Sequence, residues 1–175
     1  MSVALVSILG PDRVGLVAAI AGELYDSGVS LRDTTFASLG SGAEFSAICD
    51  LPDEVLPQEI EAGLKRLPEL DGAQIRVMPY AFDPNPTALA RVTHRITIGG
   101  GDQLGLVARL SHVFAQHGAN IVRLEARKLP EAEGGLYVTR FAVAIPPDRA
   151  ALCLATVANT AGALGLASRA EESAT

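Results

Sequence analysis

Cysteine is scarce in this chain, with only Cys49 and Cys153 among 175 residues. Two cysteines without CxxC spacing cannot build the disulfide framework of a small secreted protein, and they do not form the paired-thiol site of a metal chaperone. The N-terminal residues show no basic segment followed by an apolar run and a small-residue cleavage site, so we expect no export signal. A reduced, cytoplasmic setting is therefore expected.

Basic residues are also few, with 14 Lys and Arg against 20 Asp and Glu. Residues 1–80 hold five basic and twelve acidic side chains, a net charge of −7, whereas residues 81–175 hold nine and eight, a net charge of +1. An acidic chain without a basic stripe is poorly suited to phosphate backbones. Aromatic residues make up 5% of the chain, and an RNA-binding sheet needs them in its central strands. We therefore expect no direct nucleic-acid partner.

Long apolar runs and catalytic motifs are missing as well. The longest uncharged stretch, residues 150–168, consists mostly of Ala, Gly and Thr, and it predicts a buried helix rather than a membrane span. The sequence contains no GxSxG elbow, HExxH motif or P-loop. Its three histidines lack the spacing of metal ligands. We expect no catalytic site, no metal site, no cofactor and no membrane partner.

What the chain does contain is a repeat with an offset of 90 residues. Residues 10–18, GPDRVGLVA, recur as residues 100–108, GGDQLGLVA, with six of nine positions identical. The match continues where GVSL at 28–31 corresponds to GANI at 118–121. Agreement in one register over two separate segments indicates a duplicated unit.

Each copy shows the same order of predicted elements. A strand leads through a glycine-containing turn into an amphipathic helix, which should end at Gly28 or Gly118. Two strands joined by a turn follow, and then a helix opened by proline and a closing strand. The predicted strands are 2–9, 29–39, 44–51 and 74–80 in the first copy, and 92–98, 119–129, 136–145 and the short 165–170 in the second.

The order β-α-β-β-α-β is typical of a ferredoxin-like unit. The predicted fold class is α+β, with one unit at residues 1–80, a linker at 81–91 and a second unit at 92–175. Such a sheet has helices on one face only, yet residues 136–145 carry apolar side chains at both parities. Either the other copy or another subunit covers the second face, which favours a homo-oligomer such as a dimer, or the strand is merely rich in valine.

Two tandem βαββαβ units with GPDRVGLV at the first strand–helix junction resemble a pair of ACT domains over nearly the whole chain. The resemblance is most specific in two segments, GPDRVGLVAAIAGELYDSGVSL and FASLGSGAEFSAICDLP, which are similar to the glycine cleavage system transcriptional repressor family. The first copy also resembles the N-terminal domain of formyltetrahydrofolate deformylases. The second copy is less typical, because Gly101 and Gln103 replace Pro11 and Arg13.

The resemblance implies a regulatory protein that binds a small amino acid, with glycine the first ligand to try, and it implies no enzyme activity. It favours control of glycine cleavage genes through a partner transcription factor, since no DNA-reading helix is predicted. Two other interpretations stay open. The chain could be an assembly module that binds no ligand, or a detached regulatory subunit of an enzyme of amino-acid metabolism.

The helix starts after the two glycine turns are the expected ligand sites. Unpaired N–H groups there can hold a carboxylate, and Gly15 and Gly105 would allow its close approach. Ser30 and Asn120 begin the next strands and are expected near the same end. The candidate amino-acid-binding residues are Asp12, Arg13, Val14, Gly15, Leu16, Ser30 and Leu31 in the first copy, and Asp102, Gln103, Leu104, Gly105, Leu106, Asn120 and Ile121 in the second.

Structural roles for the same residues remain open. Asp12 and Asp102 are placed to act as helix N-caps. The two turn glycines could serve close packing of helix on sheet, and Asn120 could bond to local backbone. Arg13 is as well placed to be a solvated charge as to clamp a carboxylate.

Overall fold

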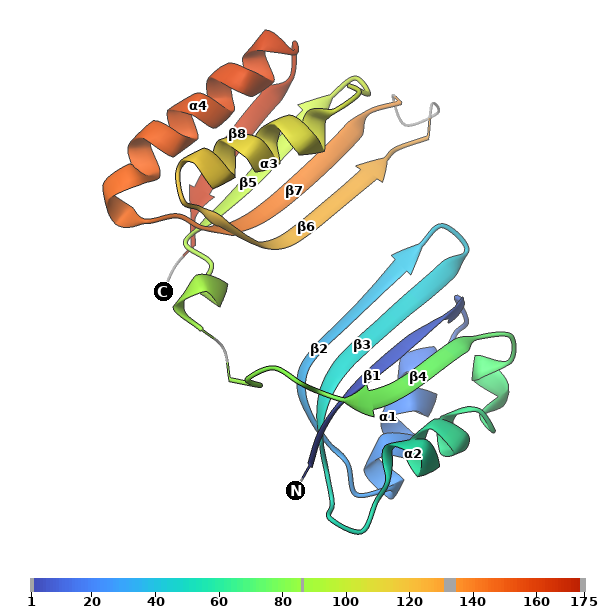
Figure 1. Cartoon of the computed structure of the whole chain (residues 1–175). Helices are drawn as coiled ribbons and strands as arrows, with labels where there is room; N and C mark the ends of the chain where they lie inside the picture. The colour runs from blue at the N-terminus through green and yellow to red at the C-terminus, as the bar shows by residue number, and fades with distance from the viewer. Residues whose placement is uncertain (1, 86, 131–134, 174–175) are drawn as a thin grey trace. The chain divides into compact units, whose positions relative to one another are not determined.

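The computed structural model describes residues 2–85, 87–130 and 135–173. The chain divides into two compact units, Met1–Pro84 and Asn85–Thr175. Each unit contains a four-stranded antiparallel sheet (Figure 1). The boundary between the units falls within the predicted linker.

The first unit has the sheet order β2-β3-β1-β4. Along β3, buried apolar residues alternate with more exposed ones, and Phe45 and Cys49 join the core formed with Ile20, Leu24 and Ile60 of the helices. This period of two places one face of the sheet under the helices. The elements are β1 (Ser2–Pro11), α1 (Leu16–Asp26), β2 (Ser30–Leu39), β3 (Gly42–Leu51), α2 (Pro57–Leu64), η1 (Pro68–Leu70) and β4 (Gln74–Pro79).

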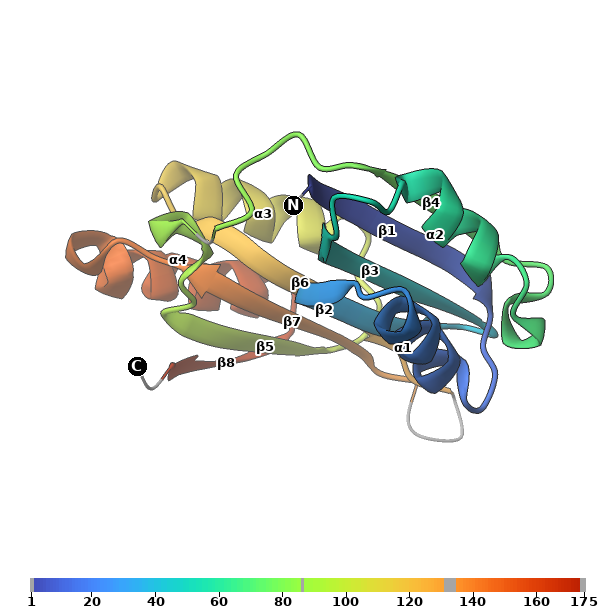
Figure 2. The ribbon, with the colours of Figure 1, turned by 90° about the horizontal axis from the view of Figure 1, so that it is seen from below.

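The second unit repeats this topology with the sheet order β6-β7-β5-β8. Both of its helices lie on the same face of the sheet (Figure 2). Phe114 of the first helix packs against Phe141 of the central strand β7, with ring centroids 5.2 Å apart. The elements are η2 (Ala88–Ala90), β5 (His94–Gly100), α3 (Leu106–Gln116), β6 (Asn120–Lys128), β7 (Tyr137–Ala144), η4 (Pro147–Arg149), α4 (Ala150–Ala163) and β8 (Ala167–Glu172).

The ends of α1 and α3 follow the prediction. Gly28 and Gly118 have φ angles of +71° and +67°, and the next residue donates its N–H back across the helix end, from Val29 to the Leu24 carbonyl and from Ala119 to the Phe114 carbonyl, both at 2.9 Å. This pattern is the Schellman motif, in which a glycine adopts the left-handed conformation just past the helix.

The closing strand of the second unit differs from the prediction. β8 lies two residues further along the chain than the predicted strand 165–170, and its six residues equal those of β4 in number. It pairs with β5 along its whole length. The charged side chains at 169, 171 and 172 resemble a solvated tail in the sequence, but an exposed edge strand accommodates such charges.

None of the helices within the described ranges is long and apolar enough to cross a lipid bilayer.

Candidate functional site

The two glycine turns precede α1 and α3 with the same geometry. Leu16 donates its N–H to the Arg13 carbonyl, and Leu106 donates to the Gln103 carbonyl, both at 3.2 Å. Gly15 and Gly105 then take the N-cap positions. The prediction that Asp12 and Asp102 are N-caps is therefore wrong, because each turn delays the helix start by three residues.

The turn glycines are required by their backbone conformation. The φ angles of Gly15 and Gly105 are +87° and +81°, in a region of backbone conformation that residues with a Cβ rarely adopt. A Cβ added at Gly15 or Gly105 would meet no heavy atom of the described residues within 4 Å. Close packing of helix on sheet is therefore not the reason for glycine here, and the space beside each turn is open.

The carboxylates of the two loops reach across to the far ends of β2 and β6. Asp12 Oδ2 accepts a hydrogen bond from Ser38 Oγ at 2.8 Å. Asp102 Oδ2 lies 3.2 Å from Lys128 Nζ. Ser38 and Lys128 are themselves 90 residues apart, so the same contact is built twice with different partners.

Arg13 has a role that the sequence did not suggest. Its guanidinium donates to the carbonyls of Pro68 and Glu69 in η1, at 2.8 and 3.2 Å. These bonds brace the first loop against its own unit. Arg13 is therefore neither a free solvated charge nor a clamp already presented to a carboxylate, and the second copy has Gln103 at this position.

A cavity of about 240 Å³ lies beside the second glycine turn. Five of the predicted site residues line it together with three others. The lining residues are Asp102, Gln103, Leu104, Gly105, Leu106, Val107, Ala108 and Tyr137. Leu104 is 99% exposed at the tip of the loop, as Val14 is at the tip of the first loop, whereas Leu106 and Leu16 are buried in the cores of their units.

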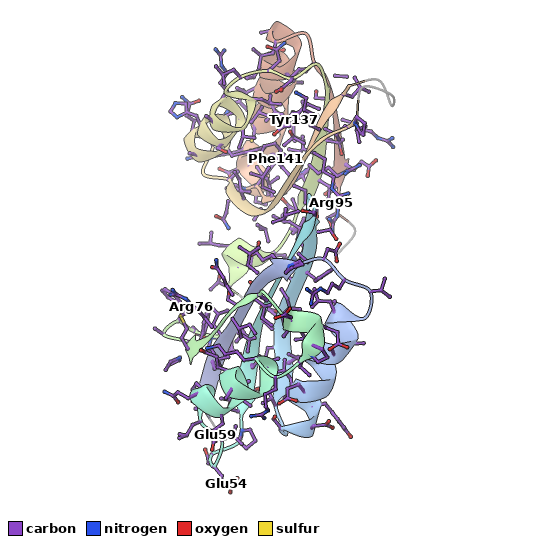
Figure 3. The ribbon with its side chains drawn as sticks, turned by 90° about the vertical axis from the view of Figure 1, so that its right-hand side faces the viewer. Glu54, Glu59, Arg76, Arg95, Tyr137 and Phe141 are labelled. Atoms are coloured by element: carbon purple, nitrogen blue, oxygen red, sulfur yellow. The ribbon has the colours of Figure 1, made fainter. Side chains whose placement is uncertain are left out.

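Sequence reasoning missed Tyr137, which is labelled in Figure 3 together with Phe141 of the same strand. Tyr137 lies opposite Gly100, just as Ala43 lies opposite Gly10. These counterparts are 94 residues apart instead of 90, because the second hairpin is longer. The strand pairing in the structure identifies Tyr137 as the counterpart of Ala43, whereas the constant offset of 90 residues does not.

The expectation that Ser30 and Asn120 lie near the glycine turns is wrong. Ser30 pairs with Asp50, which pairs with Val3 near the start of β1, whereas the turn follows Pro11 at the other end. Eight residues of extended chain separate these ends by about 26 Å. The reason is that α1 runs back along the sheet before β2 begins, and α3 does the same before β6.

Asn120 bonds to backbone, but to a carbonyl 31 residues away and not to the local backbone that one of the open alternatives named. Its Nδ2 donates to the Leu89 carbonyl at 2.7 Å, which holds η2 against the start of β6. Ile121 packs against the core of the second unit. Its counterpart Leu31 is 40% exposed on the edge strand β2.

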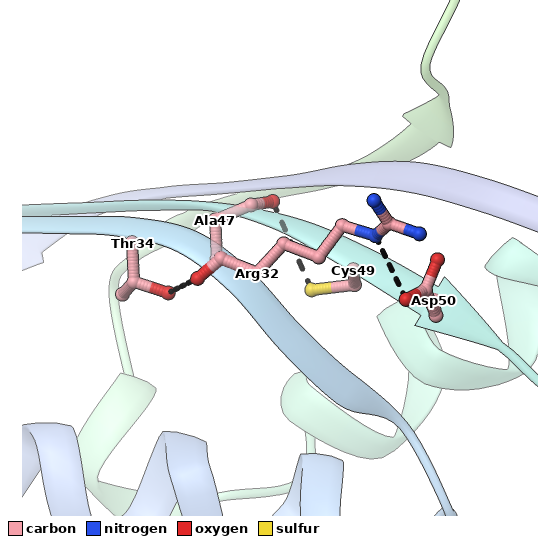
Figure 4. A network of polar contacts seen from close by, with 5 residues as sticks. All are labelled: Arg32, Thr34, Ala47, Cys49 and Asp50. Atoms are coloured by element: carbon pink, nitrogen blue, oxygen red, sulfur yellow. Dashed lines mark hydrogen bonds and ion pairs between the residues drawn. The ribbon is translucent and has the colours of Figure 1, made fainter. Parts of the chain in front are cut away.

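A second polar group, which the sequence did not indicate, lies at the Ser30 end of the first sheet (Figure 4). A bulge between Leu31 and Thr34 interrupts the β2–β3 pairing. Beside it, Arg32 Nε donates to Asp50 Oδ2 at 2.8 Å, and this hydrogen bond is the main cause that raises the pKa of Arg32. The neighbouring Cys49 has its pKa raised to about 11, first by burial and then by the Asp50 charge. This thiol therefore stays protonated and is not a nucleophile at neutral pH.

Within the described ranges, no three His, Cys, Asp or Glu side chains gather in a way that could hold a metal ion.

Two tandem α+β units of βαββαβ topology, each with a glycine turn before its first helix, have the ferredoxin-like fold that ACT domains share. No protein-family model matches the chain, and no curated protein matches its sequence. Solved structures match it over its full length. An unknown protein from Galdieria sulphuraria is 24% identical, with 99% of each chain covered and a TM-score of 0.76. A protein provisionally assigned as a glycine cleavage system transcriptional repressor is 14% identical, with 99% of this chain and 98% of that chain covered and a TM-score of 0.69. At these identities the likeness concerns the fold.

Proposed function

We propose that this chain is a regulatory protein that binds a small amino acid at the second glycine turn and acts through contact with another protein, not through catalysis. The observation that carries the proposal is the cavity lined by residues 102–108 and Tyr137. It lies where the resemblance to ACT domains implies a ligand.

The start of α3 offers the cavity two backbone donors. The first N–H that pairs with a carbonyl in the helical manner is that of Arg109, which donates to Gly105 at 2.9 Å. The N–H groups of Val107 and Ala108 precede it, and they have no backbone acceptor among the described residues. Together with the positive end of the helix dipole, they are suited to an α-carboxylate.

The other lining groups suit the rest of a small amino acid. Asp102 provides a carboxylate for an ammonium group, and Gln103 provides an amide with both a donor and an acceptor. The ring of Tyr137 and the side chain of Leu106 limit the volume of the cavity that is left for a ligand side chain. This favours glycine or another amino acid with a short side chain. Ser30 and Asn120 lie at the other ends of their own sheets and are not part of this site.

Binding would regulate by shifting the balance between two arrangements of the protein, by no more than the difference in affinity for them. The segments that resemble the glycine cleavage system repressor family make glycine the first ligand and one-carbon genes the first target. A separate transcription factor would then be the partner, because the chain lacks the positive charge of a DNA-binding protein.

Thermal melts of the full chain with each of the twenty amino acids at millimolar concentration test the proposal. A ligand at 100 times its Kd adds about 2.7 kcal/mol to the stability of the folded state, so one amino acid or a small group should stand out. A flat panel would contradict the proposal and favour an assembly module.

A matched pair of variants tests the location. Ala108→Pro removes one donor from the cavity, and proline is tolerated in the first turn of a helix. Ala18→Pro makes the same change at the equivalent position of α1. We expect the first variant to abolish the thermal shift and the second to retain it. Equal responses from both variants would show that the amino acid binds elsewhere.

A further inference from the structure

The rim of the cavity carries a pair of opposite charges. Asp102, which lines the cavity, lies 3.2 Å from Lys128 Nζ. Lys128 is directly opposite Tyr137 in the β6–β7 pairing, and Tyr137 also lines the cavity. The side chains of Lys128 and Asp102 are 66% and 55% exposed, so the pair stands at the entrance and not in the core.

The first unit builds the same contact without the positive charge. Ser38 donates to Asp12 and lies opposite Ala43 in the β2–β3 pairing. The first loop therefore keeps a carboxylate bonded to a neutral hydroxyl, and it has a methyl group where the second has a phenol ring. Among the residues that the structure describes, only the second unit places an ammonium and a carboxylate side by side next to the helix start.

We propose that Asp102 and Lys128 form a gate that selects zwitterions, an inference that rests on the proposed function. Without ligand, the two side chains neutralise each other. An amino acid replaces this one ion pair with two, because its ammonium group pairs with Asp102 and its carboxylate pairs with Lys128 and the N–H groups of Val107 and Ala108. A ligand with a single charge satisfies one partner and leaves the other without its counter-charge.

An exposed ion pair contributes little to folding. Substitution of either residue should therefore leave the melting temperature of the ligand-free protein unchanged and alter binding alone. This difference separates a role in recognition from a role in holding the loop.

Isothermal titration of the full chain tests the gate. The probes are glycine, alanine and serine, with two analogues of glycine that each carry one charge, glycolate and glycinamide. In the wild type we expect both analogues to bind at least tenfold more weakly than glycine.

Lys128→Met should weaken glycine binding about tenfold or more. Asp102→Asn should weaken glycine binding similarly and reduce the preference for glycine over glycolate. Ser38→Met, the matched change in the first unit, should bind glycine as the wild type does.

The outcomes distinguish the gate from the proposed function. If alanine or serine binds better than glycine, the matched analogues are lactate with alaninamide, or glycerate with serinamide. Suppose that an amino acid binds the wild type and that Ala108→Pro abolishes this binding. If Lys128→Met and Asp102→Asn then bind the same amino acid within twofold of the wild-type affinity, the gate is overturned and the proposed function stands. If none of the twenty amino acids binds the wild type, both are overturned.

Discussion

At the scale of single residues, Gly10 shows how closely β1 approaches the turn that leads into β4. A Cβ at Gly10 would lie 2.6 Å from Ala73 Cβ and 3.0 Å from Ala73 Cα, so the backbone itself would have to move. Gly22, in α1, has open space around the position of its missing Cβ. These two glycines therefore predict opposite effects of the same substitution.

We expect Gly10→Ala to destabilise the protein by about 1–3 kcal/mol, as overpacking does. Gly22→Ala should stabilise it by about 0.5–1 kcal/mol, because alanine loses less backbone entropy in a helix. Urea denaturation of the full chain measures both changes as shifts of the midpoint. A shift in the same direction for both variants would contradict this account.

The two cysteines give a second residue-scale prediction. Burial raises the pKa of both thiols, that of Cys49 to about 11. We expect neither thiol to react with a disulfide reagent in the folded protein at pH 8, and both to react after denaturation. Because the unfolded Cys49 thiol loses its proton at a lower pH than the folded one, Cys49 should also make stability fall as pH rises from about 9 to 11. Rapid labelling of folded protein at pH 8 would contradict the prediction.

At the scale of elements, Glu61 connects α2 to β4. Its carboxylate accepts a hydrogen bond from Lys65, which caps the C-terminal end of α2. It also accepts one from the Val77 N–H of β4, at 3.1 Å. These two bonds, Lys65 first, lower the pKa of Glu61 below its usual value of 4.5. The stabilisation is therefore present above pH 4.5 and is lost as pH falls through the lowered pKa.

Glu61→Gln should make the urea midpoint less dependent on pH between 7 and 3, because the amide does not titrate. Glu54→Gln, which removes a charge from an exposed position before α2, is the control for net charge. Denaturation at pH 7, 5, 4 and 3 measures the effect. If both variants follow the wild-type pH profile, the contact between Glu61 and β4 does not contribute to acid sensitivity.

At the scale of the whole molecule, the two units share a fold but differ around their glycine turns. Arg13 braces the first loop against η1, and Ser38 and Ala43 stand where the second unit has Lys128 and Tyr137. The duplication therefore repeats the βαββαβ fold, but the side chains around the glycine turns differ between the two units.

This difference predicts one bound amino acid per chain. Calorimetric titration of the wild type should give a stoichiometry near one, and Ala18→Pro should leave it unchanged. A stoichiometry of two, reduced to one by either proline variant, would show that the first loop binds as well.

Much of the fold was predictable, because it depends on local patterns. The order of elements and the helix ends at Gly28 and Gly118 follow from spacing within about ten residues, and the repeat offset follows from direct comparison of the two copies. The helix starts were less predictable, because an aspartate after a strand is equally suited to cap a helix or to bond across to Ser38 or Lys128. The choice depends on a partner 26 residues away.

The sequence by itself determined that the chain is duplicated, that each copy is a βαββαβ unit, and that a glycine turn precedes the first helix of each. The tertiary structure alone decided that Tyr137 joins the second loop, that Asn120 lies at the opposite end of its sheet, and that Arg13 is tied to η1. The physical reason is that these contacts depend on strand register and hairpin length, which bring distant residues together and leave no trace in local periodicity.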